Sequence, residues 1–247
     1  MIYLLLPAYN EEKALGKLIE SVIDLKKSSG LSISILAVDD GSIDNTYKTL
    51  SFYKKDIPLE IISHDKNKGL GEALKSGITT LLPKLNNDDI VVTMDADNTH
   101  DSFLIPAMID KIAEGYDVII ASRFKQGGKE IGVPYLRRFF SKGARFIFTF
   151  LFPISNVTDY TSGYRAFKAP VLKKALEKYQ NNLIEEKGFV CMVELLLKLR
   201  RIGAKMTEVP LTLRYDLKEG KSKMKIVKTV LRYLYLITKF GLFPGKC

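Results

Sequence analysis

The stretch IVVTMDADNTH, residues 90–100, is a run of apolar and β-branched residues that ends on two carboxylates, Asp95 and Asp97. Such a run, followed by a polar turn, is typical of a buried strand and the loop after it. Successive side chains of a strand point to opposite faces, so Asp95 and Asp97 point to the same face and repel each other there. We therefore expect a cation or a proton between the two carboxylates.

The same succession of strand and polar loop occurs five times in the first half of the chain. We predict strands at residues 2–6, 33–38, 59–63, 90–94 and 118–121, and helices at residues 11–27, 45–53, 70–82 and 103–112. This alternation is typical of an α/β fold, a mostly parallel sheet with helices on both faces. The motifs PAYNEE, DDGS, HDKNKG, DADNTH and SRF follow the carboxyl ends of the five strands in order. Ligands of open α/β sheets bind at that edge, so we expect the five loops to meet in one crevice.

The second half of the chain has a different pattern. Residues 126–133 are rich in Gly and Lys and predict a mobile loop, and an aromatic run follows at residues 139–152. The motif DYTSGYR, residues 159–165, leads into a short strand. Residues 187–201 predict an amphipathic helix, residues 205–215 alternate like a strand, and a basic, apolar helix is predicted from Ser222 onward.

The composition is that of a folded protein with an anionic partner. The chain has 247 residues, 46% of them hydrophobic, and a formal net charge of +10. These values exclude disorder and indicate nucleic acid, a phosphorylated small molecule or an anionic membrane surface as the partner. Cys191 and Cys247 are the two cysteines of the sequence, which disfavours a disulfide framework and favours a reducing compartment.

Neither a signal peptide nor a membrane span is predicted. The N-terminal MIYLLLPAYN has a short apolar run without a basic leader, so it predicts a first strand. The two most apolar stretches are residues 145–155 and 226–243. The first is too short to span a bilayer, and the second carries Lys228, Arg232 and Lys239.

A divalent cation is one way to resolve the repulsion between Asp95 and Asp97. Mg²⁺ or Mn²⁺ is held by one or two carboxylates together with the phosphates of a substrate. The alternative is that Asp97 only caps the following helix, together with Asn98 or Thr99. An isolated D-x-D pattern favours the cap, but this one does not stand alone.

A second acidic pair, Asp39 and Asp40, also ends a strand. A carboxylate in this position can accept a hydrogen bond from a nucleobase or a ribose hydroxyl. The alternative is a turn in which Asp44 caps the next helix. The motif NKGLGEAL, with Lys66 and Lys68 beside glycine, suits a phosphate loop, although this pattern is weak by itself.

Six motifs, taken in order and at their intervals, resemble the family 2 inverting glycosyltransferases: PAYNEE, VDDGSIDNT, NKGLGEAL, MDADNTH, ASRF and DYTSGYRAF. They are most similar to the polyprenyl-phosphate branch, typified by dolichyl-phosphate mannose synthase. The resemblance covers nearly the whole chain and implies the Rossmann-like GT-A fold. It implies a catalytic domain at residues 1–215, with a nucleotide-binding half at 1–123 and an acceptor half at 124–215. Residues 216–247 would form a basic, amphipathic membrane-interface helix.

The resemblance also implies a reaction. A hexose, mannose or glucose, would pass from a GDP- or UDP-hexose to dolichyl or undecaprenyl phosphate, with inversion and with Mg²⁺ or Mn²⁺. The chain contains no tryptophan, so it lacks the Q-x-x-R-W signature of the processive synthases in the same family, which favours a single transfer. The protein is expected on the cytoplasmic face of a membrane, peripherally bound. Whether membrane segments follow the ending LFPGKC is left open, as is the oligomeric state.

The resemblance assigns residues to the donor site. The nucleotide-binding residues are Pro7, Tyr9, Glu11, Asp39, Asp40, Lys68 and Asp95. The metal ligands are Asp95, Asp97 and Thr99. Thr99 stands where many mannose synthases have a glutamine, and its hydroxyl can reach a metal directly or through water. A lone loop histidine such as His100 is usually satisfied within the protein, so we assign it no role.

Acceptor and catalytic residues are assigned on the same basis. The catalytic set is Asp97, Asp159, Arg123 and Arg165, and the acceptor-phosphate set is Arg123, Arg165, Ser162, Lys221 and Lys223. Guanidinium groups suit the task because they bind phosphate oxygens in pairs. For the two lysines a solvated surface charge is the alternative. For Asp159 the alternative is a turn in which its carboxylate caps Ser162.

Two hydrophobic segments favour a lipid acceptor. From Met224 onward apolar residues recur at helical spacing with basic residues between them, a pattern typical of a helix in the headgroup plane. The alternative is an ordinary helix docked on the domain. The phenylalanines of residues 139–152 form either a second aromatic surface or part of the core.

Other classes of function fit less well. A phosphoacceptor signalling domain also ends a strand on an acidic pair, but it does not account for the chain length or DYTSGYR. A nucleic-acid-binding module is disfavoured because the carboxylates of the crevice repel phosphate unless a metal is bound. A glycosyltransferase with a non-lipid acceptor and a metal-dependent sugar nucleotidyltransferase remain as alternatives.

Overall fold

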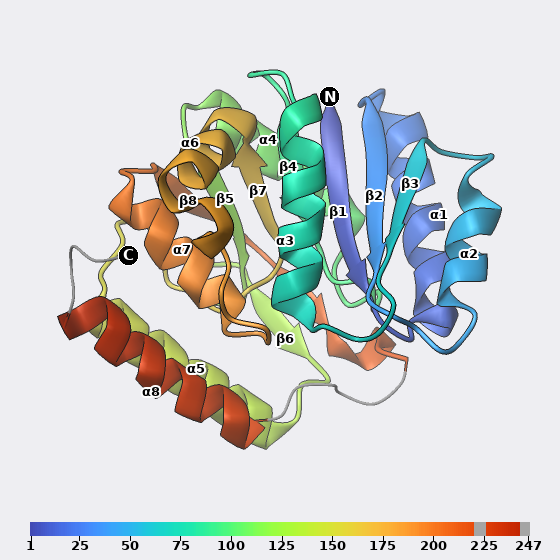
Figure 1. The fold of residues 1–247 in the computed structure, drawn as a ribbon. Helices are drawn as coiled ribbons and strands as arrows, with labels where there is room; N and C mark the ends of the chain where they lie inside the picture. The colour runs from blue at the N-terminus through green and yellow to red at the C-terminus, as the bar shows by residue number, and fades with distance from the viewer. Residues whose placement is uncertain (220–225, 243–247) are drawn as a thin grey trace.

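The computed structural model describes residues 1–219 and 226–242, and within them a seven-stranded sheet forms the centre of the molecule (Figure 1). Its strands are β1 (Ile2–Ala8), β2 (Ile33–Asp39), β3 (Leu59–Ser63), β4 (Ile90–Thr93), β5 (Val118–Ser122), β7 (Arg165–Lys168) and β8 (Met206–Pro210). The order across the sheet is β3-β2-β1-β4-β7-β5-β8. β7 runs antiparallel to β4 and β5, and the other neighbours are parallel. The predicted mostly parallel α/β sheet is confirmed.

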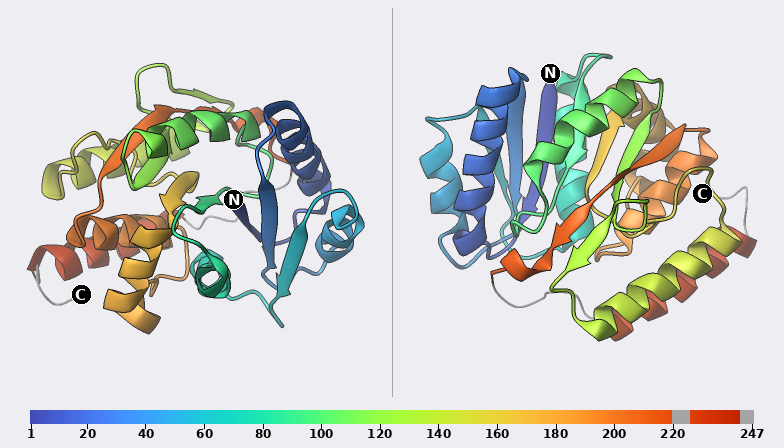
Figure 2. Two further views of the ribbon diagram at one scale, coloured as in Figure 1. Left: turned by 90° about the horizontal axis from the view of Figure 1, so that it is seen from above. Right: turned by 180° about the vertical axis from the view of Figure 1, so that it is seen from behind.

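Helices cover both faces of this sheet (Figure 2). One face carries α1 (Glu12–Ser29), α2 (Thr46–Tyr53) and α4 (Ile105–Ala113), and the other carries α3 (Leu70–Leu81), α6 (Ala169–Tyr179) and α7 (Cys191–Arg201). In β1, Leu4 and Leu6 belong to one hydrophobic core and Leu5 to the other, and all three are fully buried. The sheet is therefore buried on both faces, which explains why its strands are almost continuously apolar.

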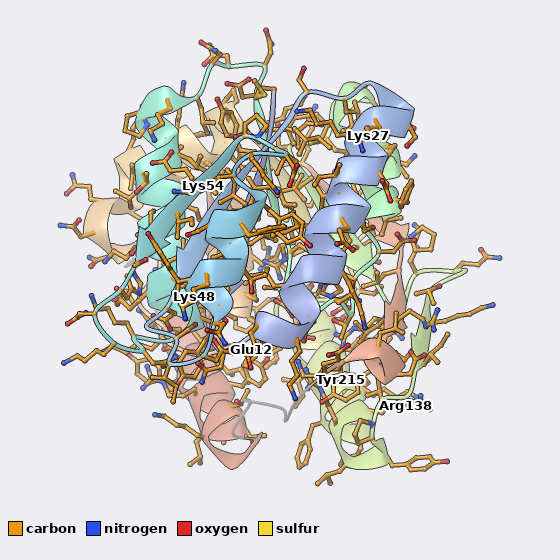
Figure 3. The ribbon with its side chains drawn as sticks, turned by 90° about the vertical axis from the view of Figure 1, so that its right-hand side faces the viewer. Glu12, Lys27, Lys48, Lys54, Arg138 and Tyr215 are labelled. Atoms are coloured by element: carbon orange, nitrogen blue, oxygen red, sulfur yellow. The ribbon has the colours of Figure 1, made fainter. Side chains whose placement is uncertain are left out.

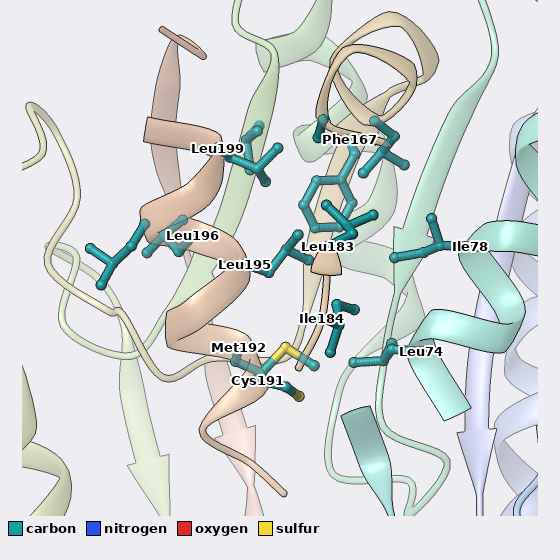
Figure 4. Close-up of a cluster of buried hydrophobic side chains, with 14 of the residues drawn as sticks. Leu74, Ile78, Phe167, Leu183, Ile184, Cys191, Met192, Leu195, Leu196 and Leu199 are labelled. Carbon is teal, nitrogen blue, oxygen red and sulfur yellow. The ribbon is translucent and has the colours of Figure 1, made fainter. Parts of the chain in front are cut away.

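Helix α3 lies unusually close to the sheet. A Cβ atom at Gly77 would lie 2.2 Å from Leu5 Cδ1, so only glycine permits this approach. On its other side α3 faces α7, and Leu183 and Ile184 lie between Leu74 and Ile78 of α3 and Leu195 of α7 (Figure 4). This packing fixes the first turn of α3 at the carboxyl edge of the sheet.

Two sequence-based predictions in the second half are wrong in detail. The predicted mobile loop contains a short strand, β6 (Lys129–Ile131), which pairs in parallel with β9 (Thr212–Arg214) in a separate two-stranded sheet. The single strand predicted over residues 205–215 is divided between β8 and β9 at Leu211, whose N–H still donates to Ser122 O of β5 while its carbonyl accepts from Lys129 N of β6. The described residues also include short 3-10 helices at Leu82–Lys84, Ser102–Leu104, Gln180–Asn182 and Tyr215–Leu217.

The aromatic run forms part of α5 (Tyr135–Leu151), which lies beside α8 (Ile226–Leu242) away from the sheet (Figures 1 and 2). Phe148 is buried and its ring packs edge-on against Tyr233 of α8, with centroids 5.3 Å apart. Phe139, Phe146 and Phe150 are each more than 70% exposed. The run thus serves both the core and the surface, the two alternatives left open by the sequence.

The positive charge is spread widely over the surface. Lys27, Lys48 and Lys54 extend from α1, α2 and the end of α2 into solvent (Figure 3). No helix among the described residues is long and apolar enough to cross a membrane. Part of the net charge of +10 is therefore ordinary solvated charge, and only the remainder is available to a specific partner.

Candidate active site

A cleft of about 860 Å³ opens at the carboxyl edge of the sheet, where the strand order changes direction between β1 and β4. Ligands of open α/β sheets bind at such switch points. Seven of the residues predicted for the nucleotide and the metal line this cleft: Pro7, Tyr9, Glu11, Asp40, Lys68, Asp95 and Asp97. The expected meeting of the polar loops in one crevice is therefore present.

A smaller cavity of about 60 Å³ shares Asp95 and Asp97 with the main cleft. It is also lined by Arg123, Ser162 and Thr99, which were predicted for the acceptor and the metal. The two carboxylates therefore line both the cleft and the smaller cavity.

The carboxylate pair is electrostatically asymmetric. Burial raises the pKa of Asp95, and the neighbouring Asp97 raises it further. Burial would also raise the pKa of Asp97, but the ammonium of Lys218, His100 and the hydroxyl of Thr99 outweigh it and lower that pKa overall. Asp97 is thus the more firmly ionised of the two, and it already has a cation beside it.

Thr99 and His100 hold the loop that carries the pair. The hydroxyl of Thr99 donates to Asp97 Oδ1 at 2.6 Å, and Thr99 N donates to the same oxygen at 3.2 Å. The backbone N–H of Asp95 lies 3.4 Å from Nδ1 of His100, whose ring packs near Tyr164. His100 is therefore a satisfied loop residue, whereas metal ligation by Thr99 stays a prediction.

The pair fits a divalent cation that a substrate completes. Within residues 1–219 and 226–242, no three acidic, His or Cys side chains are grouped so that they could hold a metal alone. Two carboxylates are sufficient when a diphosphate supplies further oxygens. The Nζ atom of Lys218 forms an ion pair with Asp97 Oδ2, which shows that the site accepts a positive charge at this point.

The two residues of the second acidic pair, Asp39 and Asp40, differ in their environment. Asp39 lines neither cavity and accepts a hydrogen bond from Ser42 N at 3.0 Å, and Asp44, the cap of the alternative, accepts one from Thr46 N at 3.0 Å at the start of α2. Asp40 lines the cleft and accepts hydrogen bonds from the N–H groups of Lys68 and Gly69, at 2.9 and 2.8 Å. His64 Nδ1 lies 2.6 Å from the same carboxylate. Asp40 therefore organises the loop before α3 from a position at the cleft wall.

Asp159 and Arg123 form a buried pair. Arg123 donates from Nε to Asp159 Oδ2 at 2.8 Å and from Nη2 to Oδ1 at 2.7 Å. Burial opposes both charges, but the pairing lowers the pKa of Asp159 and raises that of Arg123. Ser162 N also donates to Asp159 Oδ1, at 3.1 Å, which is the turn given as the alternative for Asp159. The fork of Arg123 is thus occupied by protein while the residue still lines the smaller cavity.

Arg165 is placed differently from the prediction. Its side chain has no exposed surface, lines neither cavity, and donates to the carbonyls of Met192 and Tyr160 at 2.7 and 2.8 Å. Burial lowers its pKa to about 10. This position is at odds with direct contact to an acceptor phosphate, and we do not carry Arg165 forward in that role. Ser162 has a buried hydroxyl at the smaller cavity with no hydrogen-bond partner in the described part of the chain.

Several cleft residues were not predicted from the sequence. Arg137 of α5 lines both cavities, and Lys218 and three residues of α8 line the main one. The segment before α7 adds Glu185, Glu186 and Lys187, because α7 begins at Cys191 and not at residue 187. The predicted acceptor residues Lys221 and Lys223 lie outside the described residues. Helical periodicity shows that α5 and α8 are amphipathic but does not indicate which residues face the cleft.

Comparison with known proteins identifies the relatives of this chain. The model of the family described as glycosyl transferase family 2 matches residues 3–176. A dolichol-phosphate mannosyltransferase of Pyrococcus furiosus is 32% identical over 241 residues, which cover 97% of this chain and 64% of that protein. The chain thus spans less than two thirds of that relative. An undecaprenyl-phosphate mannosyltransferase of Micrococcus luteus is 30% identical over 221 residues, covering 89% of this chain and 86% of the relative.

A third relative uses a different sugar. A UDP-N-acetylglucosamine–dolichyl-phosphate N-acetylglucosaminyltransferase of Methanococcus voltae is 30% identical, with 96% of each chain covered. Among solved structures, glucosyl-3-phosphoglycerate synthase of Mycobacterium tuberculosis, in complex with Mn²⁺, UDP-glucose and phosphoglyceric acid, superposes with a TM-score of 0.68. The identity is 20%, and 97% of this chain and 79% of the other are covered. At this identity the likeness shows the fold alone.

Proposed function

The chain belongs to glycosyl transferase family 2, and we propose that it transfers a hexose from a nucleoside-diphosphate sugar to a polyprenyl phosphate, with inversion at the anomeric carbon. The observation that carries the proposal is the position of Asp95 and Asp97 between a cleft of nucleotide size and a smaller cavity. Three relatives are named as transferases to a dolichyl or undecaprenyl phosphate, which supports a polyprenyl phosphate as the acceptor.

The donor is proposed to lie along the loops after β1 and β2. The wall formed by Pro7, Tyr9 and Glu11 suits the nucleoside, and Asp40 with the loop at Lys68 and Gly69 suits its polar groups. The start of α3 lines the cleft at Gly69 and Leu70, and the amino-terminal end of a helix favours a phosphate group. The diphosphate would then reach the carboxylate pair at the end of β4.

Asp95 and Asp97 are proposed to hold Mg²⁺ or Mn²⁺ at that point, with Thr99 orienting Asp97. The metal, when bound, supplies Lewis-acid neutralisation of the leaving nucleoside diphosphate, an effect of several kcal/mol. Lys218, which pairs with Asp97 in this structure, would give up that contact to the metal and would supply positive charge beside the diphosphate.

The acceptor is proposed to approach from α5 and α8. A phosphate monoester is ionised near neutral pH, so it needs positioning and not deprotonation before it attacks the anomeric carbon. Arg137 lines both cavities and Arg123 lines the smaller one. The guanidinium group of Arg137 suits phosphate oxygens, whereas that of Arg123 is held by Asp159 and adds positive charge beside them. The unpartnered hydroxyl of Ser162 is a further donor in the same cavity.

The apolar surface of α5 and α8 is proposed to bind the membrane that holds the lipid. We define this surface by exposed side chains of the two helices: Tyr135, Leu136, Phe139, Phe146, Phe150, Leu231, Leu234 and Tyr235. They are between 47% and 88% exposed. Large contiguous apolar patches on a protein surface are typical of sites that bind a membrane or another protein. Basic residues beside them would interact with anionic headgroups.

Replacing Phe139, Phe146 and Phe150 together by serine should lower the partition coefficient onto phosphatidylcholine–phosphatidylglycerol vesicles by at least about tenfold, because each phenylalanine contributes roughly 1–3 kcal/mol when buried. Vesicle co-sedimentation measures this. The matched control replaces Ile43, Tyr47 and Phe52, exposed apolar residues at α2, by serine. If both triple variants bound vesicles as strongly as the wild type, the proposal that α5 contacts the membrane would be wrong.

Transfer of radiolabelled sugar tests the proposed function directly. A panel of GDP- and UDP-hexoses is incubated with short polyprenyl phosphates and Mg²⁺ or Mn²⁺, and label is measured in the organic phase. We expect label from one donor, and none with EDTA. Release of free sugar without lipid product would contradict the polyprenyl-phosphate acceptor, whereas exchange of pyrophosphate into the nucleotide sugar would indicate a nucleotidyltransferase.

A further inference from the structure

Helix α8 forms part of the wall of the donor cleft as well as part of the apolar surface. Lys228, Thr229 and Arg232 line the cleft opposite the loops that follow β1 and β2. On the same wall stand Glu185 and Glu186, two carboxylates. Carboxylates at this position oppose the binding of a negatively charged diphosphate unless their charge is compensated.

The negative charges of Glu185 and Glu186 are both neutralised by basic side chains of α8. Arg232 donates to Glu186 from Nε at 2.9 Å and from Nη2 at 2.5 Å, a two-point contact with a carboxylate that is 4% exposed. Lys239, nearly two turns of α8 beyond Arg232, pairs with Glu185 at 2.7 Å. The hydrogen bonds to Lys239 and Lys198 outweigh burial and lower the pKa of Glu185 to about 2. Each acidic side chain of this wall therefore has a cation of α8 beside it.

The segment that contains Glu185 and Glu186 is also held by charged residues of α7. Glu194, fully buried, accepts hydrogen bonds from the N–H groups of Glu185 and Glu186, both at 2.9 Å. Lys198, also fully buried, pairs with Glu194 at 2.7 Å and with Glu185 at 2.9 Å. Leu183 and Ile184 fill the space between α3 and α7 (Figure 4). The segment is thus fixed between α7 and α8 by charged contacts on both sides.

This segment also touches the first turn of α3, where the donor phosphates are proposed to bind. Gly71 N donates to Lys187 O at 2.9 Å. A Cβ atom at Gly71 would lie 1.8 Å from Glu186 O, and one at Gly69 would lie 2.5 Å from Lys187 O. The two backbones are therefore in direct contact, and a shift of residues 185–187 moves one side of the phosphate-binding turn.

We propose that Arg232 and Lys239 of α8 are positioning residues for the donor: they neutralise Glu186 and Glu185 and hold residues 185–187 against the start of α3. The donor diphosphate then binds tightly only while α8 is docked. Leu231 and Leu234 of the same helix belong to the apolar surface proposed to bind the membrane, so a membrane that favours the docked helix strengthens donor binding, and the donor strengthens membrane binding equally. The proposal rests on the donor half of the proposed function.

The test is the affinity of UDP and of GDP, each with Mn²⁺, measured by titration calorimetry on the full chain. Arg232→Ala should weaken the preferred nucleotide by about fivefold, since one partner of an ion pair that is partly exposed on the arginine side is lost. Glu186→Gln should leave the affinity unchanged or raise it. The double variant Arg232→Ala, Glu186→Gln should return to within about twofold of the wild type, because the carboxylate that Arg232 neutralises is gone.

Two further variants separate positioning from folding. Arg232→Lys keeps the charge and should lose less than half of the affinity lost in Arg232→Ala. Lys48→Ala, which removes a positive charge from α2, should bind as the wild type does. An equal loss in Arg232→Ala and in the double variant, or no loss in either, would overturn the proposal. A wild-type chain that binds neither nucleotide would contradict the donor assignment as well.

Discussion

Asp97→Ala is expected to lower kcat/KM for metal-dependent transfer by about a thousandfold, the effect of losing roughly 4 kcal/mol of transition-state stabilisation. Asp97 is the more firmly ionised member of the carboxylate pair, because Lys218 and Thr99 lower its pKa despite its burial. Removing it leaves Asp95 alone to hold a divalent cation under the diphosphate. Asp97→Asn keeps the shape but loses the charge, so most of the activity should be lost there too.

The measurement has two parts, since loss of activity alone does not identify a metal ligand. Affinity for Mn²⁺ in the presence of the preferred nucleotide, followed by electron paramagnetic resonance, should fall at least about tenfold in Asp97→Ala. The chain should remain folded with a lowered melting temperature, because Lys218 and Thr99 lose their partner while the repulsion between two buried carboxylates is also removed. Asp24→Ala, an exposed change of the same charge on α1, is the control. If Asp97→Ala bound Mn²⁺ as tightly as the wild type, the proposal that Asp97 is a metal ligand would be contradicted.

The features predicted correctly from the sequence are those that depend on local pattern. The strands around Leu5 and Val92 are short, apolar and bounded by polar turns, so both their positions and the edge where their loops meet follow from periodicity. The carboxylates at Asp40, Asp95 and Asp97 then lie in the cleft because the carboxyl ends of parallel strands share one edge.

The features that were missed depend on contacts between distant segments. Pairing of β6 with β9 joins strands of three residues each, too short to give a period. The chemistry of Arg165 fits phosphate, but its partners are the carbonyls of Tyr160 and Met192, which no side-chain pattern indicates. Glu186 was not predicted because its role depends on Arg232, 46 residues away.

Asp159→Ala is expected to lower the free energy of unfolding by about 3–5 kcal/mol, the typical cost of removing one partner from a buried ion pair. Arg123 would keep its charge with 10% side-chain exposure and without its two-point partner. The N–H groups of Thr161 and Ser162 would also lose the oxygen that they share. Urea denaturation measures this change. A loss below about 1 kcal/mol would show that solvent or Glu130, 3.5 Å from Arg123 Nη1, replaces the carboxylate.

The pH dependence gives an independent test of the same pair. The pKa of Asp159 is lower in the folded chain than its ordinary value, so the unfolded state binds a proton at higher pH than the folded state does. The pair therefore stabilises the fold fully above about pH 4, and this contribution is lost as the pH falls through the folded-state pKa. Asp159→Asn should lack that part of the acid dependence. If the free energy of unfolding fell equally at acid pH in Asp159→Asn and in the wild type, the lowered pKa of Asp159 would be contradicted.

A double variant decides whether Asp159 serves the fold or the reaction. Arg123→Leu with Asp159→Leu removes both charges, and an apolar pair of similar volume often restores the stability lost by breaking a buried ion pair. We expect the free energy of unfolding of the double variant to be higher than that of Asp159→Ala. Its transfer activity should remain low, because Arg123 and the turn at Thr161 and Ser162 line the cavity beside Asp95. Recovery of transfer together with stability would instead assign Asp159 and Arg123 to the fold alone, and Arg137 would then be left as the principal guanidinium for the acceptor phosphate.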